Sequence, residues 1–246
     1  MTETDVYNQC RTEVNSAINE IYSNNSNIKA IYDGIIDTVK YYTAKYRILW
    51  ILKEPNDLEL KNNIVVGGGW DLCDVIKNIS WLDQSKKKNG LTVFRRLSQC
   101  SNYILNTNNY TENYSKEEMW QSFKSTAYIN IKKTPGGKNV SNYEIQKAYI
   151  ECREILHKQI ESINPQIIIG CNTLSYFSSY YEFDKKKKIQ FNNLKLAKKG
   201  YYINNDKLFI DISHPLKHGI SDMDYLNSIR EAVLKWEDFR LTIAST

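Results

Sequence analysis

The segment Tyr46-Arg47-Ile48-Leu49-Trp50-Ile51-Leu52, which leads into Lys53-Glu54-Pro55-Asn56, decides the fold class. Its continuous apolar run is typical of a strand that is buried on both faces. Proline cannot continue a sheet ladder, so the strand is predicted to end at Glu54-Pro55. A carboxylate therefore follows a buried strand directly.

Three further apolar runs predict strands at residues 126–131, 166–170 and 208–212. A long helix is predicted over residues 141–163, because Ser141 and Glu144 form a capping box at its start. Strands that alternate with helices are typical of a mostly parallel sheet covered on both sides. We therefore expect an α/β protein: a three-layer α/β/α sandwich with a central, mostly parallel four-stranded sheet.

Hydrophobic periodicity predicts the remaining elements. Helices are expected at residues 5–23, 28–42, 70–79, 91–105, 115–123 and 222–240, and a hairpin within residues 189–203. Residues 1–246 are expected to form a single domain, in which a core of residues 46–240 follows an amino-terminal helical addition of residues 1–45.

The composition is ordinary for a globular protein, with 41% hydrophobic and 25% charged residues in a chain of 246. The acidic start of the chain lacks the features of a signal peptide, and no apolar run is long enough to cross a bilayer. We expect a cytoplasmic monomer. The five cysteines are scattered singly, which argues against a disulfide framework and against a zinc or iron–sulfur site. They are predicted to be buried free thiols, and no metal or cofactor is expected.

Lysine and arginine total 33 against 28 acidic residues, a formal charge of +5. The lysines cluster at residues 86–88, 132–133, 185–188 and 198–199. Such clusters are often only solvated loops. Several clusters on one face would instead form the electrostatic footprint of a phosphate backbone.

A second ionisable residue follows a predicted strand at Ser213-His214-Pro215-Leu216. Open α/β sheets bind ligands at the carboxyl edge, so Glu54 and His214 could meet across one pocket. A carboxylate can polarise water or stabilise a developing positive charge, and a neutral imidazole can donate to a carbonyl oxygen. The alternatives are a Glu54 that caps a turn and a His214 that is structural.

Other residues near this edge have two interpretations each. Asn130 could read the edge of a base, or it could bond to backbone groups. Gly67-Gly68-Gly69 permits close backbone approach before a helix and could meet a phosphate, but it matches no phosphate-loop motif. The segment from Thr134 to Lys138 predicts a turn with positive charge. Leu216, Lys217 and His218 form a short loop with an apolar tip.

Taken in order, these segments resemble the uracil-DNA glycosylase superfamily, most nearly its compact bacterial and archaeal branch. The resemblance covers roughly residues 46–236 and rests on five motifs of low individual specificity. They are Ile48 to Asn56, Val65 to Gly69, Tyr128 to Pro135, Asn164 to Gly170, and Ser213-His214-Pro215.

The resemblance implies an enzyme that extrudes a nucleotide from DNA into a pocket and hydrolyses its glycosidic bond. Glu54 would orient the water and stabilise the oxocarbenium-like sugar, and His214 would steady the departing base. Asn130 would read the edge of that base. Leu216 would enter the gap left in the base stack. The expected DNA contacts are Lys132, Lys133, Lys138, Leu216, Lys217, His218, Gly67 and Gly68.

The chain departs from the family pattern at several positions. Leu52-Lys53 replaces a glycine-rich entrance to the first motif, and the cysteines of the family's iron–sulfur cluster have no counterparts. Val65 stands where an aromatic residue would stack on the base, and Trp70 could substitute for it. Asn56 stands where the uracil-specific branch has a tyrosine that excludes 5-substituted bases. The base-binding set expected is thus Asn130, Asn56, Val65 and Trp70, in a pocket that could accept a modified pyrimidine such as those of phage DNA.

Three functions are compatible with these features. The first is a monofunctional DNA glycosylase that uses no metal. The second is a module of the same fold that binds nucleic acid or protein without turnover, since the first motif has drifted. The third is a hydrolase or transferase acting on a free nucleoside or nucleotide.

Overall fold

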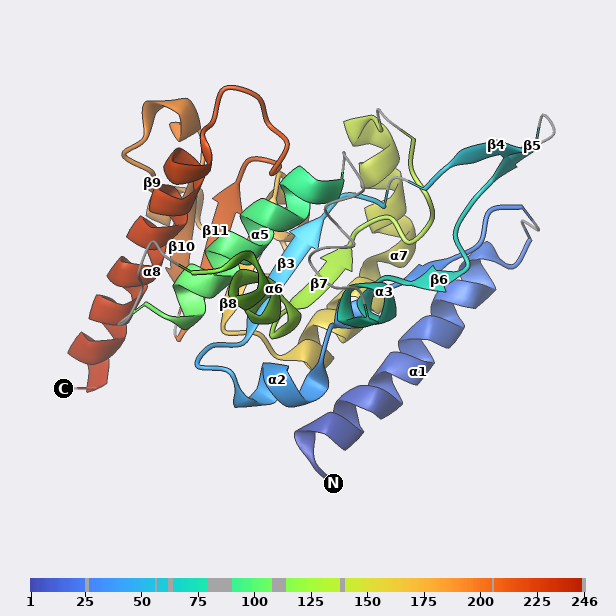
Figure 1. Cartoon of the computed structure of the whole chain (residues 1–246), viewed down its shortest axis with the longest axis horizontal. Helices are drawn as coiled ribbons and strands as arrows, with labels where there is room; N and C mark the ends of the chain where they lie inside the picture. The colour runs from blue at the N-terminus through green and yellow to red at the C-terminus, as the bar shows by residue number, and fades with distance from the viewer. Residues whose placement is uncertain are drawn as a thin grey trace.

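The computed structural model describes residues 1–24, 27–55, 57–61, 64–78, 90–107, 114–137, 140–204 and 206–244. Four strands occupy the middle of its main sheet (Figure 1): β3 (Ile48–Leu52), β7 (Ala127–Asn130), β8 (Ile167–Cys171) and β11 (Lys207–Ile212). They lie in the order β7-β3-β8-β11, and each neighbouring pair is parallel. These are the four strands predicted from the apolar runs.

Among the described residues, three further strands extend this sheet on both sides. β2 (Gly34–Ile35) pairs antiparallel with β7 at one edge, while β10 (Gly200–Asn204) and β9 (Ile189–Gln190) follow β11 antiparallel at the other. The described part of the chain therefore forms a mixed sheet of seven strands. The α/β class is confirmed, and the antiparallel β9–β10 pair confirms the predicted hairpin. The predicted number of four strands is wrong, because edge strands of two to five residues were not all visible as apolar runs.

The order of the four parallel strands contains a topological switch point. If the four strands are numbered in chain order, they lie side by side as 2-1-3-4. The chain passes from β3 to β7 on one side and from β8 to β11 on the other, so the direction of the connections reverses between β3 and β8. Open α/β sheets bind ligands outside the carboxyl ends of the strands at such a switch point. The segments after β3 and β8, and those flanking them after β7 and β11, are therefore the first place to look for a site.

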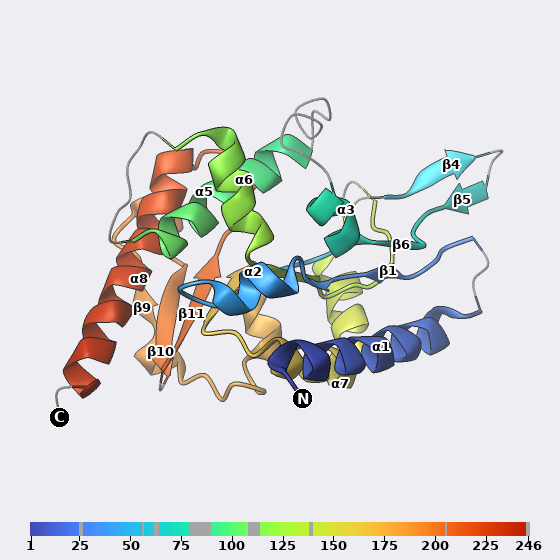
Figure 2. The ribbon, with the colours of Figure 1, turned by 60° about the horizontal axis from the view of Figure 1, so that its bottom comes forward.

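Helices cover both faces of the sheet (Figure 2). On one face lie α5 (Gly90–Leu105), α6 (Lys116–Lys124), α8 (Asp222–Ala244) and the short α3 (Leu72–Asn78). Their buried side chains share one apolar cluster with Trp50 and Ile169 of the sheet. On the other face α7 (Asn142–Ile163) packs on Leu49 and Ile51, with α1 (Glu3–Tyr22) beside it. The expected three layers are present.

Helix ends follow the local sequence closely. Ser141 and Glu144 form the predicted capping box at α7, and Ser115 and Glu118 form another at α6. In each, the serine hydroxyl accepts a backbone N–H bond while the glutamate accepts one in return, which satisfies donors that a helix start leaves free. The loop after β8 contains a 3-10 turn, η1 (Leu174–Phe177). Two more turns, η2 (Lys185–Lys187) and η3 (Leu194–Leu196), flank β9.

The predicted helix at residues 28–42 is wrong. This segment forms β1 (Ile31–Tyr32), β2 and only a short α2 (Thr38–Thr43). Gly34 adopts φ +145°, and a side chain at this position would collide with the hydroxyl of Tyr7. Between the strands Asp33 is buried against Lys133 and Gln159. Long-range pairing of a buried charge thus overrides a local helical pattern.

A small hairpin projects from the rest of the protein, beside the segment that follows α1 (Figure 1). It consists of β4 (Glu59–Lys61) and β5 (Ile64–Val66), which pair antiparallel. The chain then forms β6 (Trp70–Asp71), parallel to β1. The described helices include none that combines the length and apolarity needed to cross a membrane. All five cysteines are free, and all except the partly exposed Cys10 are buried, as predicted for those four.

Candidate functional site

The carboxyl edge of the parallel strands gathers three of the predicted site residues. The arrowheads of β3, β7 and β11 point to the upper part of Figure 1, where their loops begin. Asn130 is the last residue of β7, and Glu54 and His214 each stand two residues beyond the ends of β3 and β11. The side chains of Leu52 and Ile212, two positions earlier, belong to the same core cluster. Asn130 pairs with Leu52 across β7 and β3, so strand alternation directs Asn130 to the face of this cluster, whereas Glu54 and His214 lie beyond the strand ends at the same edge.

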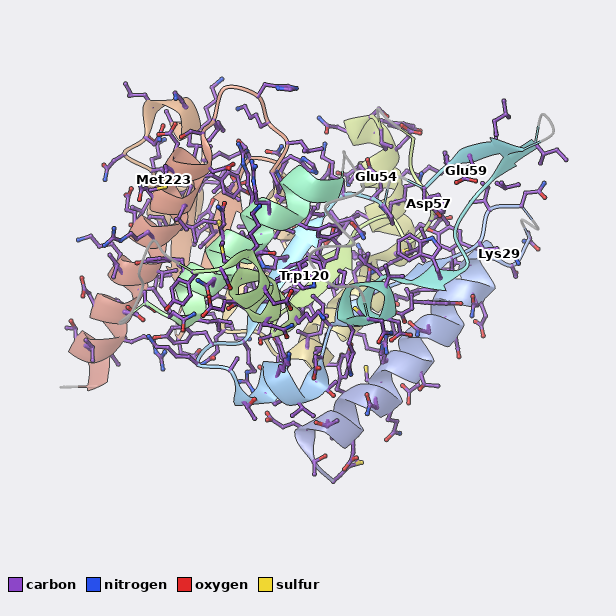
Figure 3. The ribbon with its side chains drawn as sticks, viewed as in Figure 1. Lys29, Glu54, Asp57, Glu59, Trp120 and Met223 are labelled. Carbon is purple, nitrogen blue, oxygen red and sulfur yellow. The ribbon has the colours of Figure 1, made fainter. Side chains whose placement is uncertain are left out.

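Glu54 is half-buried, and its Oε2 atom has no hydrogen-bond partner in the described structure. Burial raises the pKa of its carboxyl above the ordinary value, while the ammonium groups of Lys53 and Lys132 oppose that rise. Figure 3 shows Glu54 beside the amino-terminal end of α7, where Glu144 adds a weaker rise to the same pKa. A carboxylate oxygen that is shielded from solvent but unbonded is available to a water molecule or a ligand.

The turn after β7 packs tightly against Glu54. The N–H of Gly136 donates to the carbonyl oxygen of Pro55 at 2.7 Å, and that of Lys132 donates to the Lys53 carbonyl oxygen at 2.9 Å. A Cβ atom added to Gly136 would lie 2.3 Å from Cγ of Glu54. Gly136 thus lets the turn approach closely enough to hold the glutamate side chain in one position. The sequence pattern did not identify this role, since it depends on contact between two separate loops.

His214 is poised as a neutral hydrogen-bond donor. Its Nδ1 accepts the backbone N–H of Leu216 at 3.2 Å. Burial lowers the pKa of the imidazole below its ordinary value, and the charge of Lys53 lowers it further. A neutral ring whose Nδ1 accepts a hydrogen bond carries its proton on Nε2. Nε2–H is therefore the group that His214 presents to a ligand.

The charge of Lys53 acts on both Glu54 and His214. Its ammonium lowers the pKa values of both Glu54 and His214, so both groups lie within range of one charge. Nζ of Lys53 donates to Oδ1 of Asn142, at the first turn of α7, at 3.0 Å. The residue that replaces glycine in the first motif therefore helps to define the electrostatics of the edge.

Two buried polar side chains at this edge have no internal partner. Asn130 is 1% exposed, and neither its Oδ1 nor its Nδ2 is hydrogen-bonded within the described structure. Ser213, also 1% exposed, has an unbonded Oγ, although its carbonyl oxygen accepts from Tyr225 at 2.9 Å. Leaving a buried amide unbonded costs free energy, and such groups in folded proteins commonly serve a ligand or ordered water. Backbone bonding, the alternative interpretation of the Asn130 side chain, is not observed. Ser213 is a polar group that sequence reasoning did not assign.

The loop after His214 carries its apolar residue at the surface. Leu216 is 43% exposed, and Lys217 and His218 are exposed beside it. An exposed leucine flanked by cationic and polar side chains has the composition expected of a wedge that enters a base stack. Lys132, on the opposite side of Glu54, is partly buried and donates to the Pro135 carbonyl oxygen at 3.0 Å.

The predicted DNA contact at Lys133 is wrong. Its side chain is completely buried, and Nζ donates to Oδ1 of Asp33 at 2.6 Å and to Oε1 of Gln159 at 2.8 Å. Oδ2 of Asp33 in turn accepts the backbone N–H of Asn130 at 2.8 Å. Lys133 therefore supports the strand that carries Asn130 and cannot reach a phosphate.

The predicted phosphate contacts at Gly67 and Gly68 are also wrong. The N–H of Gly67 donates to the Asn27 carbonyl oxygen and that of Gly68 to Oδ2 of Asp57. Both donors are thus used inside the protein. Gly68 has φ +78°, and a Cβ there would lie 2.0 Å from the Lys29 carbonyl oxygen, so the glycine serves close packing.

The two apolar candidates for base stacking differ in position. Val65 lies on the projecting hairpin opposite Leu60 and is 49% exposed, so the structure does not bring it to the sheet edge (Figure 1). The prediction for Val65 is therefore corrected. Trp70 packs against the core, and its Nε1–H donates to Oδ2 of Asp57 at 2.7 Å. These contacts favour the core interpretation of Trp70. Asn56 and Lys138, predicted to contact base and DNA, lie outside the described residues.

The lysine clusters are only partly available to a polyanion. Lys188 and Lys199 both pair with Asp211, and Lys195 pairs with Asp224. Residues 185–187 are exposed in η2. Residues 86–88 fall outside the described part of the chain. Near β11, residues 185–187 are therefore exposed lysines, whereas Lys188 and Lys199 are already paired with a carboxylate.

Neither of two cavities of similar volume is lined by Glu54, Asn130 or His214. One of about 370 Å³ lies at the base of the hairpin and is lined by Lys29, Asp57 and Glu59, among others (Figure 3). Its two carboxylates make it unsuitable for phosphate. Another of about 360 Å³ lies between η1 and the lysines of η2, beside Asp211. We assign the site from the unbonded buried polar groups, because chemistry depends on those groups and cavity volume alone does not identify it.

Within the described residues, no cluster of three or more histidine, cysteine or acidic side chains is arranged to hold a metal ion. Searches of protein-family models and of curated proteins returned no match to this chain.

Proposed function

We propose that this protein is a DNA base glycosylase that hydrolyses the N-glycosidic bond of a flipped uracil or modified pyrimidine and leaves an abasic site. The observation that carries the proposal is the set of groups at one sheet edge: a shielded carboxylate, a neutral imidazole and a buried, unbonded amide. The resemblance of five ordered segments to the uracil-DNA glycosylase superfamily supports the same reaction.

Glu54 acts on the sugar side of the bond. As the glycosidic bond breaks, positive charge develops on the sugar, and a shielded carboxylate stabilises that charge more strongly than an exposed one would. The unbonded Oε2 also accepts a hydrogen bond from the attacking water and directs it toward the anomeric carbon. The water supplies the hydroxyl group to the sugar and the proton that the base finally retains.

His214 and Asn130 act on the base. Negative charge develops on the departing pyrimidine, and Nε2–H of His214 donates to the carbonyl oxygen that gains it. The side-chain amide of Asn130 offers two N–H donors and one carbonyl acceptor to the edge of the base. A base that fails to match them would leave buried polar atoms unbonded, which provides discrimination between bases.

The DNA contacts come from the loops around the edge. Leu216 fills the gap in the stack, and Lys217 and Lys132 neutralise nearby phosphates. Asn56 stands at the sequence position where the uracil-specific branch has a tyrosine, and its smaller side chain is the reason for including 5-substituted pyrimidines among the proposed substrates.

A panel of oligonucleotides tests this function. Duplexes and single strands carrying uracil, thymine, or 5-substituted uracils and cytosines are incubated with the protein, and abasic sites are cleaved with alkali. Strand breaks at one class of base are expected. Tight DNA binding without breaks at any base would instead support the non-catalytic module, and cleavage of free nucleosides alone would support the nucleotide enzyme. Breaks at uracil but at no 5-substituted base would refute the enlarged pocket.

The pH dependence follows from the two shifted groups. The reaction needs Glu54 ionised and His214 neutral; the pKa of Glu54 is raised above 4.5 and that of His214 is lowered below 6.5. The single-turnover rate is therefore expected to fall with decreasing pH, with a midpoint above 4.5, because the raised pKa of Glu54 sets the lower limit. In His214→Gln the uncharged amide leaves Glu54 as the titrating group, so an acid limb should persist. A rate that increases as the pH falls would contradict the role of Glu54.

Gly136→Ala tests the packing that holds Glu54. The added methyl group would lie 2.3 Å from Cγ of Glu54 and displace the carboxylate. A displacement of about 1 Å is enough to lower the cleavage rate by about 10²-fold. Gly137→Ala is the matched control, because a Cβ at the adjacent glycine meets no atom within 4 Å. Equal rates for the two variants, measured where thermal unfolding shows both to be folded, would overturn this assignment.

A further inference from the structure

Arg96 joins α5 to both ends of the loop that follows His214. Its Nη1 donates to the Pro215 carbonyl oxygen and its Nη2 to the Ile220 carbonyl oxygen, each at 2.5 Å. Its Nε donates to Oδ1 of Asp222, at the start of α8, at 2.6 Å. The side chain is only 9% exposed, and its guanidinium lies 5.4 Å from the ring centroid of Tyr225.

These contacts enclose the four exposed residues of the loop, which are Leu216, Lys217, His218 and Gly219. The guanidinium is planar and rigid, so its two terminal nitrogens fix the distance between the Pro215 and Ile220 carbonyl oxygens. A lysine ammonium, which is a single charged group on a flexible chain, would not fix that distance. Leu216 is therefore presented from a short loop whose two ends are held by one side chain. Because its N–H is also bonded to His214, the loop position and the imidazole orientation are linked.

We infer that Arg96 is a positioning residue that holds the Leu216 loop and, through it, the His214 ring in the geometry needed to extrude and cleave a base. This inference rests on the proposed glycosylase function. It assigns to Arg96 no contact with the substrate. The contacts that carry it join residues more than a hundred positions apart, so no sequence motif marks them.

Arg95 provides a matched control. It pairs with the other oxygen of the same carboxylate, Oδ2 of Asp222, at 2.7 Å, but its side chain is 41% exposed. Arg95→Lys and Arg96→Lys therefore make the same chemical change at two arginines that share Asp222. Only Arg96 is observed to bond the loop carbonyls.

The first measurement is amide hydrogen exchange, which needs no substrate. Arg96→Lys should increase exchange in residues 216–219 at a temperature where the protein remains folded, whereas Arg95→Lys should not. Unchanged exchange in Arg96→Lys would overturn the inference whatever the enzyme does. If the wild-type protein cleaves no base, the proposed function fails, and this result still decides whether Arg96 holds the loop.

The second measurement is single-turnover cleavage in duplex and in single-stranded DNA. Arg96→Lys should lower the duplex rate by about 10²-fold, the cost of slight misplacement of reacting groups, and the single-strand rate by less. In single strands there is little base stack for Leu216 to enter. In a Leu216→Ala background, Arg96→Lys should add less to the duplex defect than it causes alone, because the part of its effect that acts through the Leu216 side chain is already lost. Wild-type duplex rates in Arg96→Lys, or fully additive defects, would overturn the inference.

Discussion

Glutamine in place of Glu54 is expected to lower the rate of base excision by roughly 10²–10⁴-fold, the range for loss of a positioned acid–base group. Glutamine keeps the size of the side chain and its packing against Gly136 but removes the negative charge. The amide neither stabilises positive charge on the sugar nor accepts a proton from water. Single-turnover assays should show the loss, while fluorescence anisotropy should show nearly unchanged affinity for DNA that contains the target base.

Glu144→Gln is the control for Glu54→Gln. Glu144 is exposed in the first turn of α7, and its charge acts on the same Glu54 carboxyl. Glutamine at this position still accepts the capping bond from Ser141, so the helix start is retained. Its excision rate should stay close to that of the wild type. If Glu54→Gln cuts DNA as fast as the wild type, the assigned role of Glu54 is wrong.

Methionine in place of Lys133 is expected to lower the free energy of unfolding by about 3–5 kcal/mol, the usual effect of removing one partner from a buried ion pair. The change leaves the fully buried Asp33 carboxylate without its charge partner, although Gln159 and the Asn130 backbone still donate to it. Urea denaturation followed by fluorescence measures the change. Because Asp33 bonds the backbone of Asn130, the effect reaches the strand that carries Asn130, which we propose to bind the base.

Two further variants separate the buried charge from the loss of an amine. Lys132→Met removes the neighbouring ammonium, which is partly buried and bonded to one carbonyl oxygen, and is expected to cost only about 1 kcal/mol. Asp33→Asn combined with Lys133→Met removes both charges and should recover part of the stability lost in Lys133→Met. A Lys133→Met protein as stable as Lys132→Met would contradict this account of the buried pair.

Much of the inner fold could be predicted from the sequence because the relevant signals are local. Strands buried on both faces have unbroken apolar runs, and both β3 and β8 are buried along their full length. The capping boxes of α6 and α7 also depend on residues only three positions apart. Glu54, Asn130 and His214 could be placed at one sheet edge because parallel strands share their carboxyl end.

The errors arose where distant contacts outweighed local pattern. Residues 31–35 have helical periodicity but form strands, since Asp33 is held by a lysine 100 positions away. Lys132 and Lys133 are alike in sequence, yet one is partly exposed and the other completely buried. The backbone donors of Gly67 and Gly68 were assigned to a ligand, and only the folded structure shows that internal acceptors occupy them.

The amino-acid sequence by itself determined the four buried parallel strands, the helices that separate them and the polar residues at their carboxyl ends, because hydrophobic periodicity and capping act over a few residues. Only the tertiary structure decided which of those polar residues lack internal partners, which lysine is buried, and that Gly136 and Arg96 hold the loops of the site. Each of these properties is set by groups far apart in the chain, whose proximity depends on the packing of the whole domain.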